Sequence, residues 1–173
     1  MTRATGPRTL APVAITVDIL RHGEALPRGE AGESERRLSP TGVRCLSELA
    51  GRLTLEGWKP DHVFSSPLLR ARESAGIVAR AASPTPAVET LKALEPDAEP
   101  AEVLDALATQ GVTAGHILIV GHQPLLGRLV GHLTGAETGL APGMLVRVEC
   151  PNGLDRASGK VVLTIPPQAA TGT

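Results

Sequence analysis

The sequence has almost no aromatic residues, and this limits both its core and its ligands. Among 173 residues there are one tryptophan, Trp58, one phenylalanine, Phe64, and no tyrosine. The core must therefore consist of Leu, Val, Ile and Ala, and a chain of this length buries enough of them for one domain. Stacking platforms for single-stranded nucleic acid are excluded.

The sequence also lacks a charge excess and a long hydrophobic run. The formal net charge is −1, and Arg36-Arg37 is the only adjacent basic pair. We therefore expect neither nucleic acid nor a membrane surface as a partner. No run of about 18 apolar residues is present, and residues 1–13 hold no signal-peptide core. We expect a single domain over residues 1–173, with an ordered core at about 14–166 and flexible termini.

Cysteine is scarce. Cys45 and Cys150 are far apart in the sequence, and neither has a second cysteine nearby. This excludes a disulfide framework or a cysteine metal site and favours a reduced, cytoplasmic setting. The five histidines form no His-Glu-x-x-His motif, so we expect no metal and no cofactor.

The sequence alternates apolar runs with helical patterns. β-branched runs predict strands at about 14–20, 61–65, 87–91 and 116–120, and prolines at 40, 67, 100 and 124 begin helical spacings. This rhythm predicts an α/β three-layer sandwich, with a mostly parallel central sheet and helices on both faces. Two last strands, near 144–150 and 160–165, flank Asn152-Gly153 and predict a C-terminal antiparallel hairpin with a turn there.

Histidine and arginine residues follow three of the predicted strands. Arg21 and His22 follow the first, Arg70 lies in the first turn of the helix after the second, and His122 follows the fourth. Open α/β sheets bind ligands at these strand ends. Arginine binds phosphate at two points, and nearby cations disfavour the imidazolium, leaving an imidazole that can attack phosphorus. The pattern predicts a phosphoryl-transfer site.

Four sequence blocks, in order, resemble the histidine phosphatase superfamily. They are Arg-His-Gly-Glu-Ala at 21–25, Leu-Ser-Pro-Thr-Gly at 38–42, Ser-Ser-Pro-Leu-Leu-Arg-Ala at 65–71 and Gly-His at 121–122. The resemblance spans residues 15–134 and implies a phosphoglycerate mutase-like fold. The compact length and the Arg-His-Gly-acid-Ala opening are most similar to the SixA-type phosphohistidine phosphatases.

The resemblance also implies roles for individual residues. It makes His22 the phosphorylated nucleophile. Arg21, Arg70 and Gly23 belong to the phosphate-binding set, and His122 donates a further hydrogen bond to the phosphoryl group. The implied enzyme is a metal-independent phosphatase, acting on a histidine-phosphorylated protein of a phosphotransfer or signalling system.

The leaving-group acid is the point where the sequence departs from many members of this family. They carry a glutamate shortly after the third strand, where this chain has Ala93, and Glu95 and Asp97 are the nearby candidate proton donors. An imidazole leaving group, whose conjugate acid has a pKa of about 6.5, needs less help than an alkoxide. We therefore expect a phosphohistidine substrate. A phosphatase or mutase-like enzyme acting on a small phosphomonoester, and a non-catalytic phosphate-binding module, stay open as alternatives.

Overall fold

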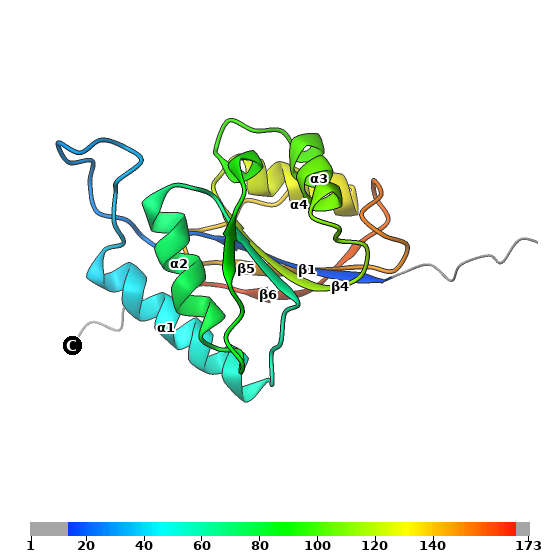
Figure 1. Cartoon of the computed structure of the whole chain (residues 1–173), viewed down its shortest axis with the longest axis horizontal. Helices are drawn as coiled ribbons and strands as arrows, with labels where there is room; N and C mark the ends of the chain where they lie inside the picture. Colours follow the sequence, from blue (N-terminus) through cyan, green and yellow to red (C-terminus); the bar gives the residue numbers. More distant parts are fainter. Residues whose placement is uncertain (1–13, 169–173) are drawn as a thin grey trace, which may run out of the picture.

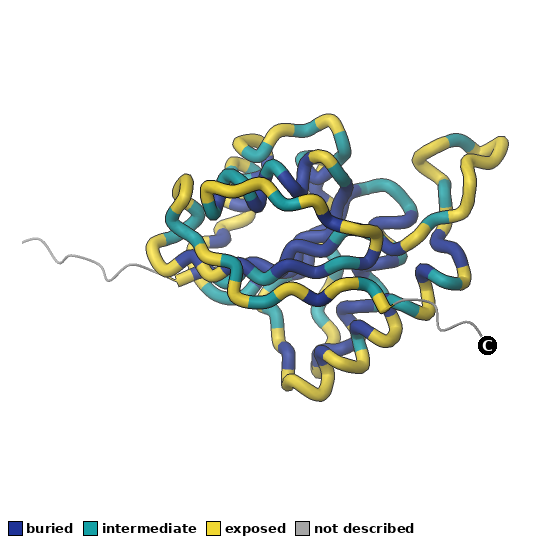
Figure 2. Tube along the Cα trace, turned by 180° about the vertical axis from the view of Figure 1, so that it is seen from behind, coloured by how far each residue is buried: buried dark blue, intermediate teal, exposed yellow. Residues whose placement is uncertain are grey.

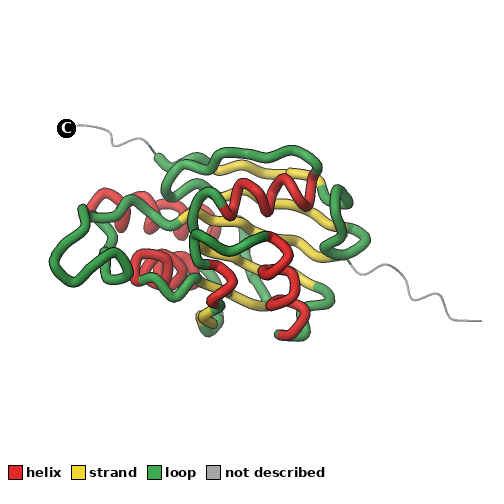
Figure 3. The backbone as a smooth tube through the Cα atoms, turned by 90° about the horizontal axis from the view of Figure 1, so that it is seen from above, coloured by secondary structure: helices red, strands yellow, loops and turns green. Residues whose placement is uncertain are grey.

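The structure is a computed structural model that describes residues 14–168. Two parts of the predicted flexible termini, residues 1–13 and 169–173, lie outside the described residues. One six-stranded sheet forms the middle layer, and helices cover both of its faces (Figures 1 and 3). The predicted α/β three-layer architecture is confirmed.

The sheet is parallel except for one strand. Its strands are β1 (Ile15–Arg21), β2 (His62–Ser65), β3 (Val88–Thr90), β4 (Gly115–Gly121), β5 (Leu145–Cys150) and β6 (Lys160–Ile165). They lie in the order β3-β2-β4-β1-β5-β6. Strand β5 runs opposite to the other five, which all point the same way. The carboxyl ends of β1, β2 and β4 therefore meet at one edge, which is where the predicted site residues follow the strands.

The helices divide into two pairs. They are α1 (Pro40–Leu55), α2 (Leu69–Ala79), α3 (Pro100–Thr109) and α4 (Leu125–Thr134), with a short 3₁₀ turn η1 (Lys92–Leu94). The first pair covers one face of the sheet and the second pair the other (Figure 1). Helix α2 begins at Leu69 rather than at the predicted Pro67, because Leu68 keeps an extended backbone.

Each face of the sheet has its own apolar core. Val17 and Ile19 of β1 pack in the core under α3 and α4, whereas Leu20 packs in the core under α1 and α2. The central strands are buried on both faces, and the loops around them are exposed (Figure 2). Within residues 14–168, no helix has the length and apolar character needed to cross a membrane.

The C-terminal hairpin is confirmed. Strands β5 and β6 pair antiparallel. The chain turns at Asn152-Gly153 as predicted, where the Gly153 amide donates to the Cys150 carbonyl at 3.4 Å, but this turn is only the start of a longer connection over residues 151–159. Gly153 does adopt a positive φ of 90°, which glycine accommodates without steric cost.

Strand β1 carries one buried carboxylate. Asp18 is fully buried and accepts hydrogen bonds from Trp58 Nε1 at 2.7 Å and Arg147 Nε at 2.7 Å, and it lies 2.8 Å from His116 Nε2. Burial by itself would raise the pKa of Asp18, but the hydrogen bonds and charges of His116 and Arg147 lower it below its usual value. The contacts tie β1 to β4, to β5 and to the segment after α1.

Candidate active site

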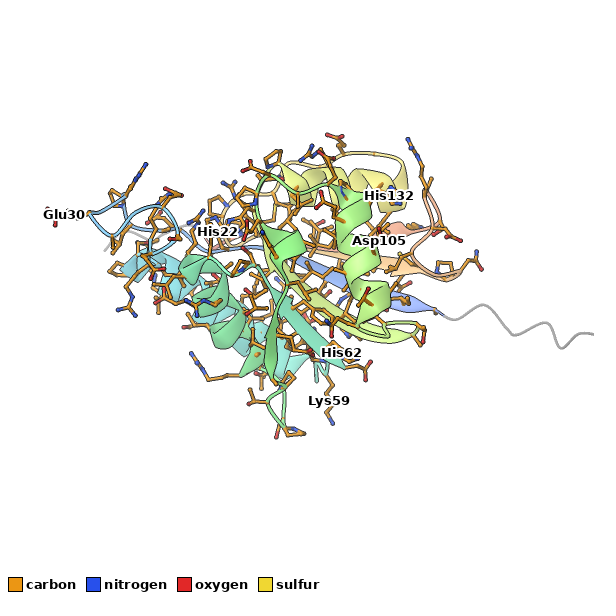
Figure 4. The ribbon with its side chains drawn as sticks, turned by 45° about the horizontal axis from the view of Figure 1, so that its top comes forward. His22, Glu30, Lys59, His62, Asp105 and His132 are labelled. Atoms are coloured by element: carbon orange, nitrogen blue, oxygen red, sulfur yellow. The ribbon has the colours of Figure 1, made fainter. Side chains whose placement is uncertain are left out.

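The parallel pairing of β1 with β4 brings the two predicted site histidines together. Arg21 pairs with Gly121, so His22 and His122 leave neighbouring strands at the same level. Their ring centroids are 4.9 Å apart. Figure 4 shows His22 between the body of the molecule and the projecting loop that carries Glu30.

Arg70 reaches the same place from the next strand along. Strand β2 pairs with β4, and Arg70 is the second residue of α2, which follows β2. Arg70 is only 4% exposed, and its Nε donates to His22 Nε2 at 3.3 Å. The four predicted residues Arg21, His22, Arg70 and His122 therefore lie in one site.

The environment of His22 fixes its tautomer and its charge. Its Nδ1 lies 2.7 Å from the Gly23 carbonyl oxygen, which only accepts, so Nδ1 carries the hydrogen and Nε2 is unprotonated, with its lone pair accepting the hydrogen bond from Arg70 Nε. Burial, together with the charges of Arg70 and Arg21, lowers the pKa of His22 to about 4 despite that hydrogen bond. The sequence attributed the neutral ring to cations alone, but burial is the larger cause.

His122 is also held neutral. Burial, then the charges of His22 and Arg70, lowers the pKa of His122 to about 3. Its Nε2 lies 2.8 Å from Ser66 Oγ. When the Ser66 hydroxyl donates to Nε2, Nδ1 of His122 carries the hydrogen and is a donor.

Two buried nitrogen atoms of this site have no hydrogen-bond partner among residues 14–168. They are Nδ1 of His122 and Nε of Arg21, although Arg21 Nη1 donates to the Leu140 carbonyl at 2.7 Å. Buried polar atoms in folded proteins are almost always paired, so two unmatched nitrogens in one site point to a ligand that accepts hydrogen bonds. An anion with several oxygens satisfies both.

The site is an open depression of about 480 Å³. Its lining consists of Arg21, His22, Arg70 and His122 together with Glu24, Ala25, Glu33, Arg36, Pro96, Gln123 and Pro142. A larger depression of about 730 Å³ lies between the 26–38 segment and the first two helices, but it contains none of the four predicted residues. All four predicted site residues therefore line the smaller depression.

Sequence analysis missed four residues that shape this site. Glu33 and Arg36 come from the loop between β1 and α1, and Ser66 and Ser74 hold other site groups in place. The sequence signal for the loop pair was its Glu-x-x-Arg spacing in the polar segment at 27–37 that follows the Arg-His-Gly-Glu-Ala block. Ser66 lies within the Ser-Ser-Pro-Leu-Leu-Arg-Ala block but was given no role of its own, and Ser74 gave no signal, since both roles depend on contacts between distant segments.

Gly23 differs from its expected place in the phosphate-binding set. Its amide donates to Ser74 Oγ at 3.0 Å, and its carbonyl accepts from His22 Nδ1, so neither backbone group is free for phosphate. A Cβ at Gly23 would overlap the side chain of Leu46. Gly23 instead lets the turn after β1 pack closely against α1 and α2.

The two candidate proton donors lie outside the site depression. Glu95 and Asp97 line a neighbouring depression with Lys92 and Ala93, and only Pro96 between them lines the site. The carboxylates that do line the site are those of Glu24 and Glu33.

Comparison with known proteins identifies the family of this chain. Residues 17–98 match the model of the histidine phosphatase superfamily (branch 1). The phosphohistidine phosphatase SixA of Escherichia coli (strain K12) is 32% identical over 125 residues, which cover 70% of this chain and 76% of that protein.

Solved structures show the same likeness. The structure of SixA complexed with tungstate has a TM-score of 0.76 at 26% identity, covering 88% of this chain and 97% of that one. Phosphoglycerate mutase from Bacillus anthracis shares the fold, with a TM-score of 0.66 at 16% identity and coverage of 87% and 92%. With the sequence match, these likenesses show that the chain belongs to the histidine phosphatase superfamily.

Proposed function

We propose that this protein is a phosphohistidine phosphatase, which removes the phosphoryl group from a histidine-phosphorylated protein through a phospho-His22 intermediate. Membership of the superfamily implies phosphatase activity. One observation carries the mechanism: an unprotonated Nε2 on His22 shares a depression with two buried nitrogens, on Arg21 and His122, that lack partners among the described residues. This set fits a nucleophile facing a phosphoryl group.

The first step transfers the phosphoryl group to His22. The substrate ring carries a proton on its other nitrogen. The lone pair on Nε2 attacks phosphorus, and the bond from phosphorus to the substrate ring nitrogen breaks and leaves its electron pair there, so that the ring departs as neutral imidazole. The Gly23 carbonyl, 2.7 Å from Nδ1, stabilises the positive charge that develops on the His22 ring. Arg21, Arg70 and His122 stabilise the equatorial phosphoryl oxygens, which is the main catalytic task in phosphoryl transfer.

The second step regenerates the enzyme. Water attacks phosphorus, the bond from phosphorus to Nε2 breaks, and its electron pair returns to His22. Inorganic phosphate leaves, and the ring is again neutral with hydrogen on Nδ1. Because guanidinium groups supply the positive charge, the proposed reaction uses no metal and no cofactor.

The substrate follows from the carboxylates around the site. Glu24 accepts a hydrogen bond from Ser39 Oγ at 2.6 Å, and Glu33 pairs with two arginines. The hydrogen bond from Arg36 and the charges of Arg36 and Arg70 lower the pKa of Glu33, which disfavours a protonated acid there. Glu95 and Asp97, which remain the candidate donors, line another depression. A leaving group that departs without an acid suits this site, and imidazole is such a group.

A comparison of substrates tests the proposal. We expect kcat/KM for a histidine-phosphorylated phosphotransfer domain to exceed by far the values for phosphoserine and 3-phosphoglycerate, at one pH and with EDTA present. A small phosphomonoester that matches the phosphoprotein would favour the metabolite phosphatase. Absence of turnover on every substrate would favour the non-catalytic phosphate-binding module.

The matched control is His22→Ala. Rapid quench with labelled substrate should trap an acid-labile phosphoenzyme in the parent and none in the variant, because only the nucleophile is removed. A variant that still forms the phosphoenzyme would show that another residue is the nucleophile.

The proposal includes a cytoplasmic setting in phosphotransfer signalling. Cys45 and Cys150 are both free, and burial raises the pKa of the Cys150 thiol to about 11. Unpaired cysteines, one of them buried and unreactive, fit a reducing compartment.

A further inference from the structure

We propose that Glu33 is an internal counter-anion of the phosphate site. Its carboxylate pairs with Arg70 and Arg36 in the free enzyme, gives way when a phosphoryl group binds, and returns to help release inorganic phosphate. The inference rests on the proposed function in one respect, namely that Arg70 binds the phosphoryl group.

The contacts of Glu33 place its negative charge on the phosphate-binding cations. Its Oε1 lies 3.1 Å from Arg70 Nη2 and 2.9 Å from Arg36 Nη1. Both arginines line the depression that contains His22, and Glu33 lines it too. A phosphoryl dianion that binds there must compete with the Glu33 carboxylate for the same arginines.

Arg70 does not need this carboxylate to keep its position. The backbone carbonyl of Glu33 accepts from Arg70 Nη1 at 2.9 Å, and Arg70 Nε donates to His22 Nε2 at 3.3 Å. The loop backbone is fixed independently, because the Leu69 amide donates to the Ser34 carbonyl at 2.9 Å. Loss of the carboxylate alone therefore leaves the guanidinium held by two other contacts.

The carboxylate is also free to leave. The Glu33 side chain is 48% exposed, whereas that of Arg70 is 5% exposed. Rotation of one side chain carries the carboxylate into solvent, and ion pairs at such exposed positions are weak enough to exchange. Arg70 then stays in place, and the phosphoryl group replaces the Glu33 carboxylate as its anionic partner.

The consequence is a lower affinity for every anion that uses Arg70, including the product. Like charges close together repel, so Glu33 opposes bound phosphate whether or not it has rotated fully away. After hydrolysis the same repulsion favours release of inorganic phosphate. Glu33 thus sets the balance between holding the phosphoryl group and releasing the product.

The experiment uses Glu33→Gln in the full chain, which keeps the size of the side chain and removes its charge. The matched control is Glu35→Gln, an exposed residue of the same loop that makes no ion pair within residues 14–168. Affinity for inorganic phosphate is measured by titration calorimetry at pH 8, where phosphate is a dianion, and checked as product inhibition. Thermal denaturation confirms folding of both variants.

We expect E33Q to bind phosphate about fivefold more tightly than the parent or more, with a parallel fall in KM, and E35Q to stay within about twofold of the parent. The difference in phosphate affinity between E33Q and the parent should become smaller as NaCl rises from 0.05 to 0.5 M, because salt screens the charge of Glu33. A purely structural role of Glu33 would not produce this salt dependence.

Three results would overturn the inference: unchanged or weaker phosphate binding by E33Q, an equal gain in E35Q, or no measurable phosphate binding by either the parent or E33Q. Calorimetry needs no turnover. Failure of the proposed phosphohistidine phosphatase activity, seen in the substrate and phosphoenzyme assays, is therefore distinguished from failure of this inference.

Discussion

Replacing Arg70 by lysine tests whether the site needs the shape of a guanidinium and not only its charge. Arg70 uses all three of its nitrogens: Nε donates to His22 Nε2 at 3.3 Å, and Nη1 and Nη2 contact Glu33 at 2.9 and 3.1 Å. Lysine has a single nitrogen at the end of a flexible chain. It keeps the charge but loses the two-point contact with a phosphoryl group.

The size of the effect follows from that lost contact. A hydrogen bond to a charged group contributes roughly 1.5–3 kcal/mol, and Arg70→Lys removes at least one from the bound phosphoryl group. The loss of transition-state stabilisation should therefore be at least about 1.4 kcal/mol, which lowers kcat/KM about tenfold or more. Because Arg70 is almost completely buried, solvent does not replace the missing donor.

The assay is steady-state hydrolysis of a histidine-phosphorylated domain, with urea unfolding run in parallel to confirm that the variant is folded. Arg72→Lys is the matched control, since Arg72 lies on the same helix and is exposed. We expect its kcat/KM to equal that of the parent. An unchanged kcat/KM in Arg70→Lys would refute the argument that two-point recognition by Arg70 drives catalysis.

Three further predictions follow from the site and its supports. Burial and neighbouring charges lower the pKa values of the two site histidines to about 4 and about 3, so the unfolded chain binds more protons below pH 6.5. The two neutral histidines should therefore contribute their full stabilisation above pH 6.5, and the free energy of unfolding should fall as the pH drops towards 4. Urea titrations should show a shallower fall with pH in His122→Gln, and the same pH dependence as in the parent would refute the role of His122. Asp18→Asn should cost about 3 kcal/mol in urea unfolding because it leaves the Arg147 charge without its buried partner, and unchanged stability would refute the importance of this contact. Glu95→Gln and Asp97→Asn should leave hydrolysis of phosphohistidine unchanged, whereas a large loss confined to phosphoserine would identify one of them as the acid for poor leaving groups.

Local patterns in the sequence were sufficient to predict the layers of the fold and to predict that Arg21, His22, Arg70 and His122 lie near one another. The run that became β4 is apolar on both faces because both faces are buried, and β1 carries Ile15, Val17 and Ile19 on one face, so both runs are recognisable without knowing their partners. Arg21 and His22 directly follow one of these runs and His122 the other. Since parallel strands present their carboxyl ends at one edge, the convergence of these residues was predictable from order along the chain.

Local patterns did not determine contacts that depend on packing between distant segments. The turn predicted at Asn152-Gly153 became a longer connection, because pairing of β5 with β6 sets where the strands end. In the sequence, Asp18 is a single polar residue within a predicted strand. The contacts with Trp58 and Arg147, which exist only in the folded structure, make it a buried centre of hydrogen bonds.

The electrostatics of the site were decided by the tertiary structure. The sequence placed cations beside His22, but the larger cause of its lowered pKa is burial, which exists only once the sheet, α2 and the loop after β1 have packed together. The same packing set Glu33 against Arg70 and turned the Gly23 amide towards Ser74. Residue order therefore determined which groups meet at the strand ends, while their protonation and their hydrogen-bond partners depend on three-dimensional contacts, because burial and distance are not properties of a linear sequence.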